Sequence, residues 1–251
     1  MACAWVRGWP ALTALVWTSL LAAGEVRLAV AANFAAPMQS LSLGFEQETG
    51  HRVLLSVGST GGLSAQIRHG APFDALLAAD DATPQILERE GLGVAGSRFT
   101  YAIGRLVLWS RHPQRVDAEG EVLRRGPVER LALANPKLAP YGAAAIQTLT
   151  RMGLWPGLQT RVVMGENIAQ TYQFVSTGNA PLGFVALSQV WSQGRIREGS
   201  AWIVPADWHN PIRQDAIVLQ AGRNKPAVQA WMRYLRSDAA RALIRAHGYE
   251  S

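Results

Sequence analysis

The chain has 251 residues, of which 49% are hydrophobic and 17% are charged, an ordinary composition for a globular protein. Its formal net charge is +6, but the basic residues are scattered along the chain, which argues against nucleic-acid binding. The single cysteine, Cys3, lies in the predicted signal peptide, so we expect no disulfide, no catalytic thiol and no cysteine-bound metal in the mature protein.

Residues 1–24 are predicted to form a secretory signal peptide. A short basic start that includes Arg7 precedes the apolar run Ala11–Leu21, and small residues follow at Ala22-Ala23-Gly24, where cleavage is expected. The apolar run is too short for a convincing membrane span. We therefore expect export to the periplasm, and the net charge falls from +6 to +5 when Arg7 is removed.

The next part of the chain alternates strands with helices. The nearly continuous apolar run Val26–Ala32 is typical of a parallel strand buried on both faces, and further strands are predicted at Arg52–Val57 and Phe73–Ala79. Helices are predicted to follow these strands, over Ala35–Thr49, from about Leu63 to Gly70, and from Thr83-Pro84 onward. Three strand-then-helix units in a row imply a parallel sheet with right-handed crossovers.

A second series of such units follows a change of character near the middle of the chain. Phe99–Ser110 is predicted as one long extended run, and the polar loop His112–Gly126 after it suggests a crossing between lobes in this region. Later strands are predicted at Leu131–Ala134, Val162–Met164, Leu182–Val185, Trp202–Val204 and Ala216–Leu219. We expect an α/β protein of two lobes, 25–103 plus 207–251 and 104–206, each a mainly parallel sheet flanked by helices, with a cleft between them.

The turn Gly58-Ser59-Thr60-Gly61-Gly62 joins a predicted strand to a predicted helix. A helix start presents unpaired main-chain N–H groups and the positive end of the helix dipole, so this turn can hold an anion without a lysine or arginine. Ser59 or Thr60 can equally serve as a simple N-cap, with the glycines easing the turn. The turn by itself leaves both interpretations open.

Three other strand ends carry candidate ligand contacts, because ligands of open parallel sheets bind beyond the carboxyl ends of the strands. They are marked by Asn33 after Ala32, by Tyr141, and by Ile168, whose main-chain N–H lies at a helix start. Taken singly, Asn33 also suits an N-cap, Tyr141 a half-buried aromatic, and Ile168 a core position. Helix capping explains Asp80-Asp81 more simply than a metal site or an acid–base pair does.

Several segments, taken together and in order, resemble the periplasmic molybdate-binding proteins of ABC importers. The resemblance covers nearly the whole mature chain. The segments that carry it are Ala31-Ala32-Asn33-Phe34, Gly58–Gly62 with Ala65-Gln66-Ile67, Gly70–Asp74, Ser97–Gly104, Pro181–Leu187 and Gly248-Tyr249.

This resemblance implies the type II periplasmic-binding-protein fold, with a tetrahedral oxyanion enclosed between the lobes. It implies that molybdate, and tungstate with it, is bound by Ala32, Asn33, Ser59, Thr60, Tyr141 and Ile168. It implies no cofactor and no metal site other than the one that holds molybdenum as molybdate. It also implies a monomer that is not an enzyme and that delivers its ligand to a membrane permease. Two departures concern the donors, since many members of the family carry serine in place of Asn33 and tyrosine in place of Ala186.

Two alternatives stay open from the sequence. The ligand could be another tetrahedral oxyanion, such as sulfate, because the donor set differs from that of many family members. The chain could instead be an enzyme acting on a small phosphorylated or sulfated compound, although the sequence places no general base near Ser59 or Thr60 and lacks a nucleophile elbow or a phosphate-binding glycine loop.

Overall fold

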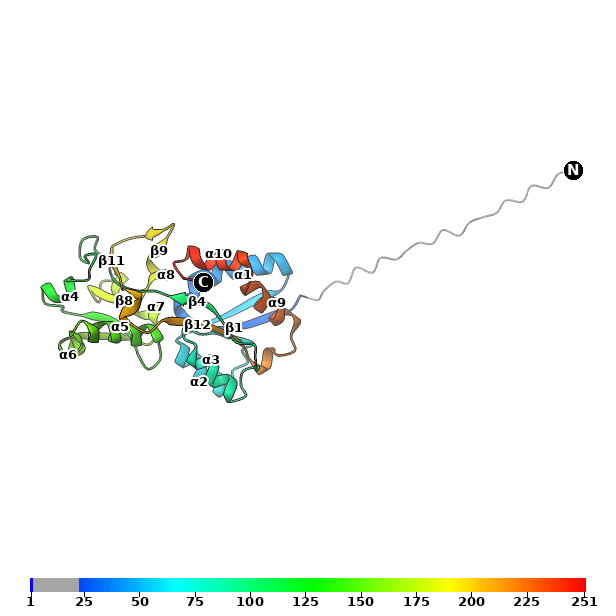
Figure 1. Ribbon diagram of the computed structural model, residues 1–251. Coiled ribbons are helices and arrows are strands. Elements are labelled where there is room, and N and C mark those ends of the chain that lie inside the picture. The colour runs from blue at the N-terminus through cyan, green and yellow to red at the C-terminus, as the bar shows by residue number, and fades with distance from the viewer. Residues whose placement is uncertain (2–22) are drawn as a thin grey trace.

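The computed structural model describes Met1 and residues 23–251, which form two α/β lobes side by side (Figure 1). The predicted signal peptide lies outside the described residues except at its two ends. None of the helices in the described part of the chain combines the length and the apolar character that a membrane span requires. The fold is the one expected, two mixed sheets flanked by helices with a cleft between the lobes.

The first lobe is built on a five-stranded sheet of order β2-β1-β3-β12-β4. Four of its strands run in the same direction and β12 runs against them. The strands are β1 (Glu25–Ala31), β2 (Arg52–Gly58), β3 (Ala75–Leu77), β4 (Phe99–Gly104) and β12 (Ile212–Val218). The helices are η1 (Ala32–Phe34), α1 (Ala35–Thr49), α2 (Thr60–Arg68), α3 (Ala82–Arg89), η4 (Gln220–Gly222), α9 (Pro226–Leu235) and α10 (Asp238–Ala246).

The second lobe repeats this plan with a sheet of order β11-β5-β8-β6-β7. Here β5 runs against the other four strands. The strands are β5 (Leu106–Ser110), β6 (Leu131–Ala134), β7 (Val162–Gly165), β8 (Leu182–Ala186) and β11 (Ser200–Ile203), and a small hairpin joins β9 (Trp191–Ser192) to β10 (Arg195–Ile196). The helices are α4 (Val122–Arg125), α5 (Pro140–Arg151), α6 (Trp155–Leu158), η2 (Gln159–Arg161), α7 (Ile168–Ser176), α8 (Leu187–Val190) and η3 (Ala206–Trp208).

The chain crosses between the lobes in two places, and the first lies earlier in the chain than the polar loop where the sequence predicts it. The run Phe99–Ser110 is not one strand, because it breaks at Arg105 into β4 of one sheet and β5 of the other. The crossing therefore precedes the polar loop 112–126, whose Val116 N–H donates to Ser200 of the second lobe. An apolar run shows that a segment is extended but not which sheet it joins. The second crossing links β11 to β12, and the predicted lobe boundaries near these crossings remain predictions.

Burial explains why β1 forms the centre of the first lobe. Val26, Leu28, Ala29 and Val30 are all fully buried, so the strand packs against helices on both faces, as its continuous apolar sequence predicts. The apolar core of the second lobe continues through Ala31, Ala32 and Ala79 of the first. The two lobes thus contact each other directly at the carboxyl end of β1.

Candidate ligand-binding site between the lobes

All six residues predicted to bind the ligand line one small cavity between the lobes. Residues of η1 and the start of α2 supply one side, and the starts of α5 and α7 supply the other. The complete lining is Ala31, Ala32, Asn33, Gly58, Ser59, Thr60, Ala79, Ala139, Pro140, Tyr141, Asn167 and Ile168. None of these side chains carries a charge, so any ligand held here is bound by neutral groups.

The start of α2 contributes two hydroxyl groups that face the cavity. Ser59 Oγ accepts a hydrogen bond from Gly62 N–H at 3.3 Å and so caps the helix. Thr60 Oγ1 accepts a hydrogen bond from Ala79 N–H at 3.0 Å. The capping interpretation of Ser59 is therefore confirmed, yet it does not compete with ligand binding, because each hydroxyl uses only its oxygen and keeps its proton to donate.

The start of α5 contributes the third hydroxyl. Pro140 occupies the first turn, and no side chain caps the helix. Tyr141 is 1% exposed, and its Oη accepts a hydrogen bond from Gln214 Nε2 at 3.2 Å. Burial raises the pKa of Tyr141 well above its usual range, and the neighbouring Tyr249 and Tyr101 add to this effect. The hydroxyl therefore stays protonated at neutral pH and can donate a hydrogen bond.

Main-chain N–H groups complete the set of donors. At the start of α7, Asn167 Oδ1 accepts hydrogen bonds from Ala169 and Gln170 N–H and leaves Ile168 N–H uncapped. Among residues 23–251, no acceptor bonds to the main-chain N–H of Ile168, Thr60 or Tyr141. Three helix starts thus each present one unpaired N–H group at the same cavity, where their dipoles favour negative charge.

Asn33 lines the cavity but differs from the other predicted contacts. It is 2% exposed, and its Nδ2 already donates to Gln214 Oε1 at 2.8 Å and to Tyr249 Oη at 3.1 Å. Its side-chain amide hydrogens are therefore used within the protein. The other departure, Ala186, is fully buried at the start of α8, where its N–H donates to Gln189 Oε1.

Contacts across the cleft show that the lobes are closed around the cavity. Gly61 N–H donates to Leu138 O at 2.9 Å, which joins the start of α2 to the loop before α5. Ser188 Oγ of the second lobe donates to Asn33 O at 2.9 Å. No local sequence pattern marks Ser188 or Gln214 as a site residue, so neither could be predicted from the sequence.

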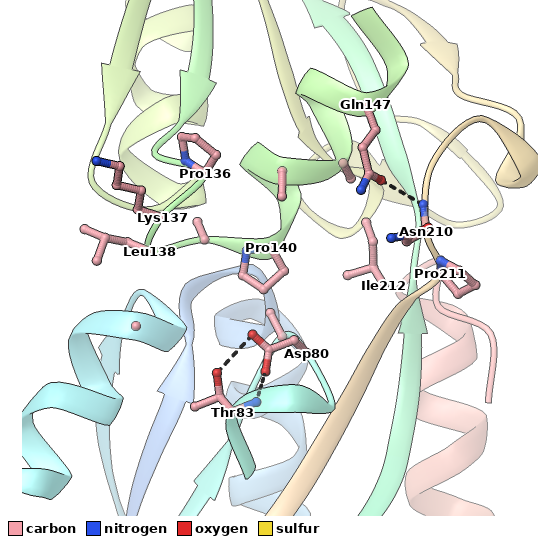
Figure 2. A pocket seen from close by; sticks show the side chains of 15 residues that line it. Asp80, Thr83, Pro136, Lys137, Leu138, Pro140, Gln147, Asn210, Pro211 and Ile212 are labelled. Atoms are coloured by element: carbon pink, nitrogen blue, oxygen red, sulfur yellow. Dashed lines mark hydrogen bonds between the residues drawn. The ribbon is translucent and has the colours of Figure 1, made fainter. Parts of the chain in front are cut away.

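A larger hollow of about 290 Å³ lies beside the small cavity and shares Ala79, Ala139 and Pro140 with it. Figure 2 shows Asp80 turned toward Thr83, whose N–H and hydroxyl donate to it at 2.8 and 3.1 Å, so the capping prediction is confirmed for Asp80, while Asp81 makes no side-chain cap bond. Burial raises the pKa of Asp80. Asp80 and Lys137 are the titratable side chains that line the hollow, one of each sign. The small cavity, by contrast, has no charged side chain in its lining.

No group of three or more histidine, cysteine, aspartate or glutamate side chains within the described residues is placed to hold a metal ion. The fold and the cavity define the class of protein: two α/β lobes closed on a small space that neutral donors line. The chain belongs to the family of bacterial extracellular solute-binding proteins, whose model matches residues 26–250.

Three relatives are particularly similar. The molybdate-binding protein ModA of Azotobacter vinelandii is 55% identical over 90% of each chain. That of Rhodobacter capsulatus is 46% identical over 91% of this chain and 89% of its own. Among solved structures, the periplasmic molybdate-binding protein of Azotobacter vinelandii superposes with a TM-score of 0.87 at 39% identity, over 90% of this chain and 99% of that one.

Proposed function

We propose that this protein captures molybdate, and tungstate with it, in the cavity between its lobes and delivers the anion to the membrane permease of an ABC importer. The observation that carries the proposal is the donor set. Within residues 23–251, three hydroxyls each accept a hydrogen bond from the protein and can donate a proton to the ligand, and three helix starts each keep one N–H group without a protein acceptor. The names of the similar proteins favour molybdate as the oxyanion.

Neutral donors suit a doubly charged ligand energetically. A buried lysine or arginine would itself have to be desolvated, and that cost can exceed the attraction gained. Each hydrogen bond to a charged group contributes about 1.5 to 3 kcal/mol, so several of them suffice for tight binding. Because the cavity presents mainly hydrogen-bond donors, a ligand that carries its own proton, such as hydrogen phosphate, should bind more weakly than a fully deprotonated oxyanion.

The wider role follows from the family. We propose that the mature protein works in the periplasm as a monomer, carries no cofactor, binds molybdenum only as molybdate through Ala32, Asn33, Ser59, Thr60, Tyr141 and Ile168, and catalyses no reaction. Its similarity to solute-binding proteins supports this role.

Isothermal titration of the mature protein with molybdate, tungstate, sulfate and phosphate tests the proposal. We expect molybdate and tungstate to bind and the other two anions to bind far more weakly. At 100 times its dissociation constant, molybdate should add about 2.7 kcal/mol of stability, which raises the unfolding temperature by about 5 to 11 °C. Heat from sulfate but none from molybdate, or conversion of a phosphorylated or sulfated compound, would contradict the proposal.

A further inference from the structure

A buried glutamine lies behind the cavity, on a strand that leads from one lobe to the other. Gln214 belongs to β12 and is fully buried. The register between β12 and β4 shifts between Gln214 and Asp215, a β-bulge that leaves Tyr101 without a partner in the ladder. Bulges of this kind often direct side chains toward functional sites.

Both ends of the Gln214 amide are used, and each end faces a different lobe. Its Oε1 accepts hydrogen bonds from Asn33 Nδ2 at 2.8 Å and from Tyr101 Oη at 3.1 Å, both in the first lobe. Its Nε2 donates to Tyr141 Oη of the second lobe at 3.2 Å. Tyr101 shares its one proton with Ala78 O at 2.9 Å, so Asn33 Nδ2 is the donor that holds the carbonyl end and turns the NH₂ group toward Tyr141.

We propose that Gln214 is a positioning residue that makes Tyr141 a hydrogen-bond donor to the ligand. An NH₂ group can only donate, so Tyr141 Oη has to accept from it, and the single proton of Tyr141 is left for another acceptor. The Tyr249 hydroxyl also lies beside Tyr141 Oη, but its oxygen already accepts from Asn33 Nδ2 at 3.1 Å. The acceptor is then an oxygen of the bound anion, and this inference rests on the proposed function.

The crossing strands hold the Tyr141 hydroxyl in place from a second side. Gly104 ends β4 and pairs with Ile212 of β12. A Cβ atom at Gly104 would overlap the Tyr141 hydroxyl and lie 2.6 Å from Gln214 Nε2. The absence of a side chain at Gly104 thus lets Tyr141 reach Gln214. Since Gln214 and Tyr141 belong to different lobes, lobe closure brings the donor into position.

A purely structural role for Gln214 makes a different prediction. If Gln214 only stabilised the crossing strands, its loss would lower stability and would affect ligand binding independently of the Tyr141 hydroxyl. If it positions that hydroxyl, removing the hydroxyl should abolish most of its effect on affinity. The interaction between the two substitutions therefore distinguishes the two roles.

The experiment is a double-mutant cycle with molybdate as the probe, measured by titration calorimetry on the mature protein. Tyr141→Phe should weaken binding by about 10- to 150-fold, the loss of one hydrogen bond to a charged group. Gln214→Met should weaken it by at least about fivefold, and the double variant should bind within about threefold of Tyr141→Phe alone. The inference would be overturned if the double variant lost affinity by the product of the two single-variant losses. Wild-type affinity in Gln214→Met would overturn it as well.

Two further variants keep the test decisive. Gln220→Met makes the same chemical change at a glutamine that donates to Gly91 O and Gly93 O, away from the cavity, and should leave the affinity unchanged. If Gln214→Met does not fold, Gln214→Glu keeps the acceptor for Asn33 and Tyr101 but removes the donor, and Tyr141→Phe should then change the affinity less than about threefold in that background. A wild-type protein that binds no molybdate would refute the proposed function itself and the inference with it.

Discussion

Replacing Thr60 with valine removes one hydroxyl while keeping the shape of the side chain. Thr60 is 2% exposed, and its Oγ1 accepts from Ala79 N–H at 3.0 Å while its proton stays free for the ligand. Loss of one hydrogen bond to a charged ligand costs about 1.5 to 3 kcal/mol. We therefore expect the dissociation constant for molybdate to rise about 10- to 150-fold.

The same substitution has a second effect that can be measured separately. Without Thr60 Oγ1, the buried Ala79 N–H has no partner, which costs about 1 to 3 kcal/mol in the unliganded protein and lowers its unfolding temperature by about 2 to 12 °C. Thr60→Ser keeps the hydroxyl and should retain both properties. Thr148→Val removes another buried hydroxyl, which donates to Ala144 O within α5, and should leave affinity unchanged.

Titration calorimetry reports the affinity, and thermal unfolding without ligand reports the stability. Wild-type affinity in Thr60→Val, together with a lower unfolding temperature, would show that Thr60 serves only Ala79 and would refute the assignment of its proton to the ligand.

Three other predictions concern closure, burial and packing. Ser188→Ala removes the hydrogen bond to Asn33 O across the cleft and should weaken molybdate binding about 2- to 13-fold in calorimetry, while unchanged affinity would mean that this contact does not favour the closed state. Gly104→Ala should weaken molybdate binding and lower the unfolding temperature, since its Cβ would displace the Tyr141 hydroxyl. Wild-type affinity and stability in this variant would contradict that packing. Above about pH 10 the unfolded chain releases tyrosine protons that the folded protein retains. The free energy of unfolding, measured by chemical denaturation, should therefore fall by up to about 1.4 kcal/mol per pH unit for each tyrosine involved. Tyr101→Phe should reduce this slope. The tyrosines with pKa values raised by burial in the network are Tyr101, Tyr141 and Tyr249.

The local order of strands and helices could be predicted from sequence because it depends on nearby residues. The continuous apolar run that forms β1 is fully buried from Leu28 to Val30, and the Ser59-Thr60-Gly61 turn does start a helix. The break at Arg105 could not be predicted, because β4 and β5 are both extended and apolar and differ only in the sheet that each joins.

Part of the candidate site could also be predicted from the sequence, and part could not. Thr60, Tyr141 and Ile168 lie at helix starts that a local pattern or a family resemblance can mark, and the structure places them around one cavity. Gln214 lies 73 residues from Tyr141 and 181 from Asn33 in sequence, in a strand with no distinguishing motif. Nothing local to Gln214 indicates that its two ends bond to different lobes.

The sequence by itself determined the two series of strand–helix units, the absence of cysteine after Cys3, and the hydroxyl and glycine residues at helix starts, because each depends on residue types and short spacings. Only the tertiary structure decided which hydrogen bonds these groups make. The oxygen of Thr60 is held by Ala79 and that of Tyr141 by Gln214, and in each case the partner is distant in sequence. Whether a hydroxyl can donate its proton to a ligand depends on what already bonds to its oxygen, and that is fixed by folding of the first lobe for Thr60 and by contact between the lobes for Tyr141.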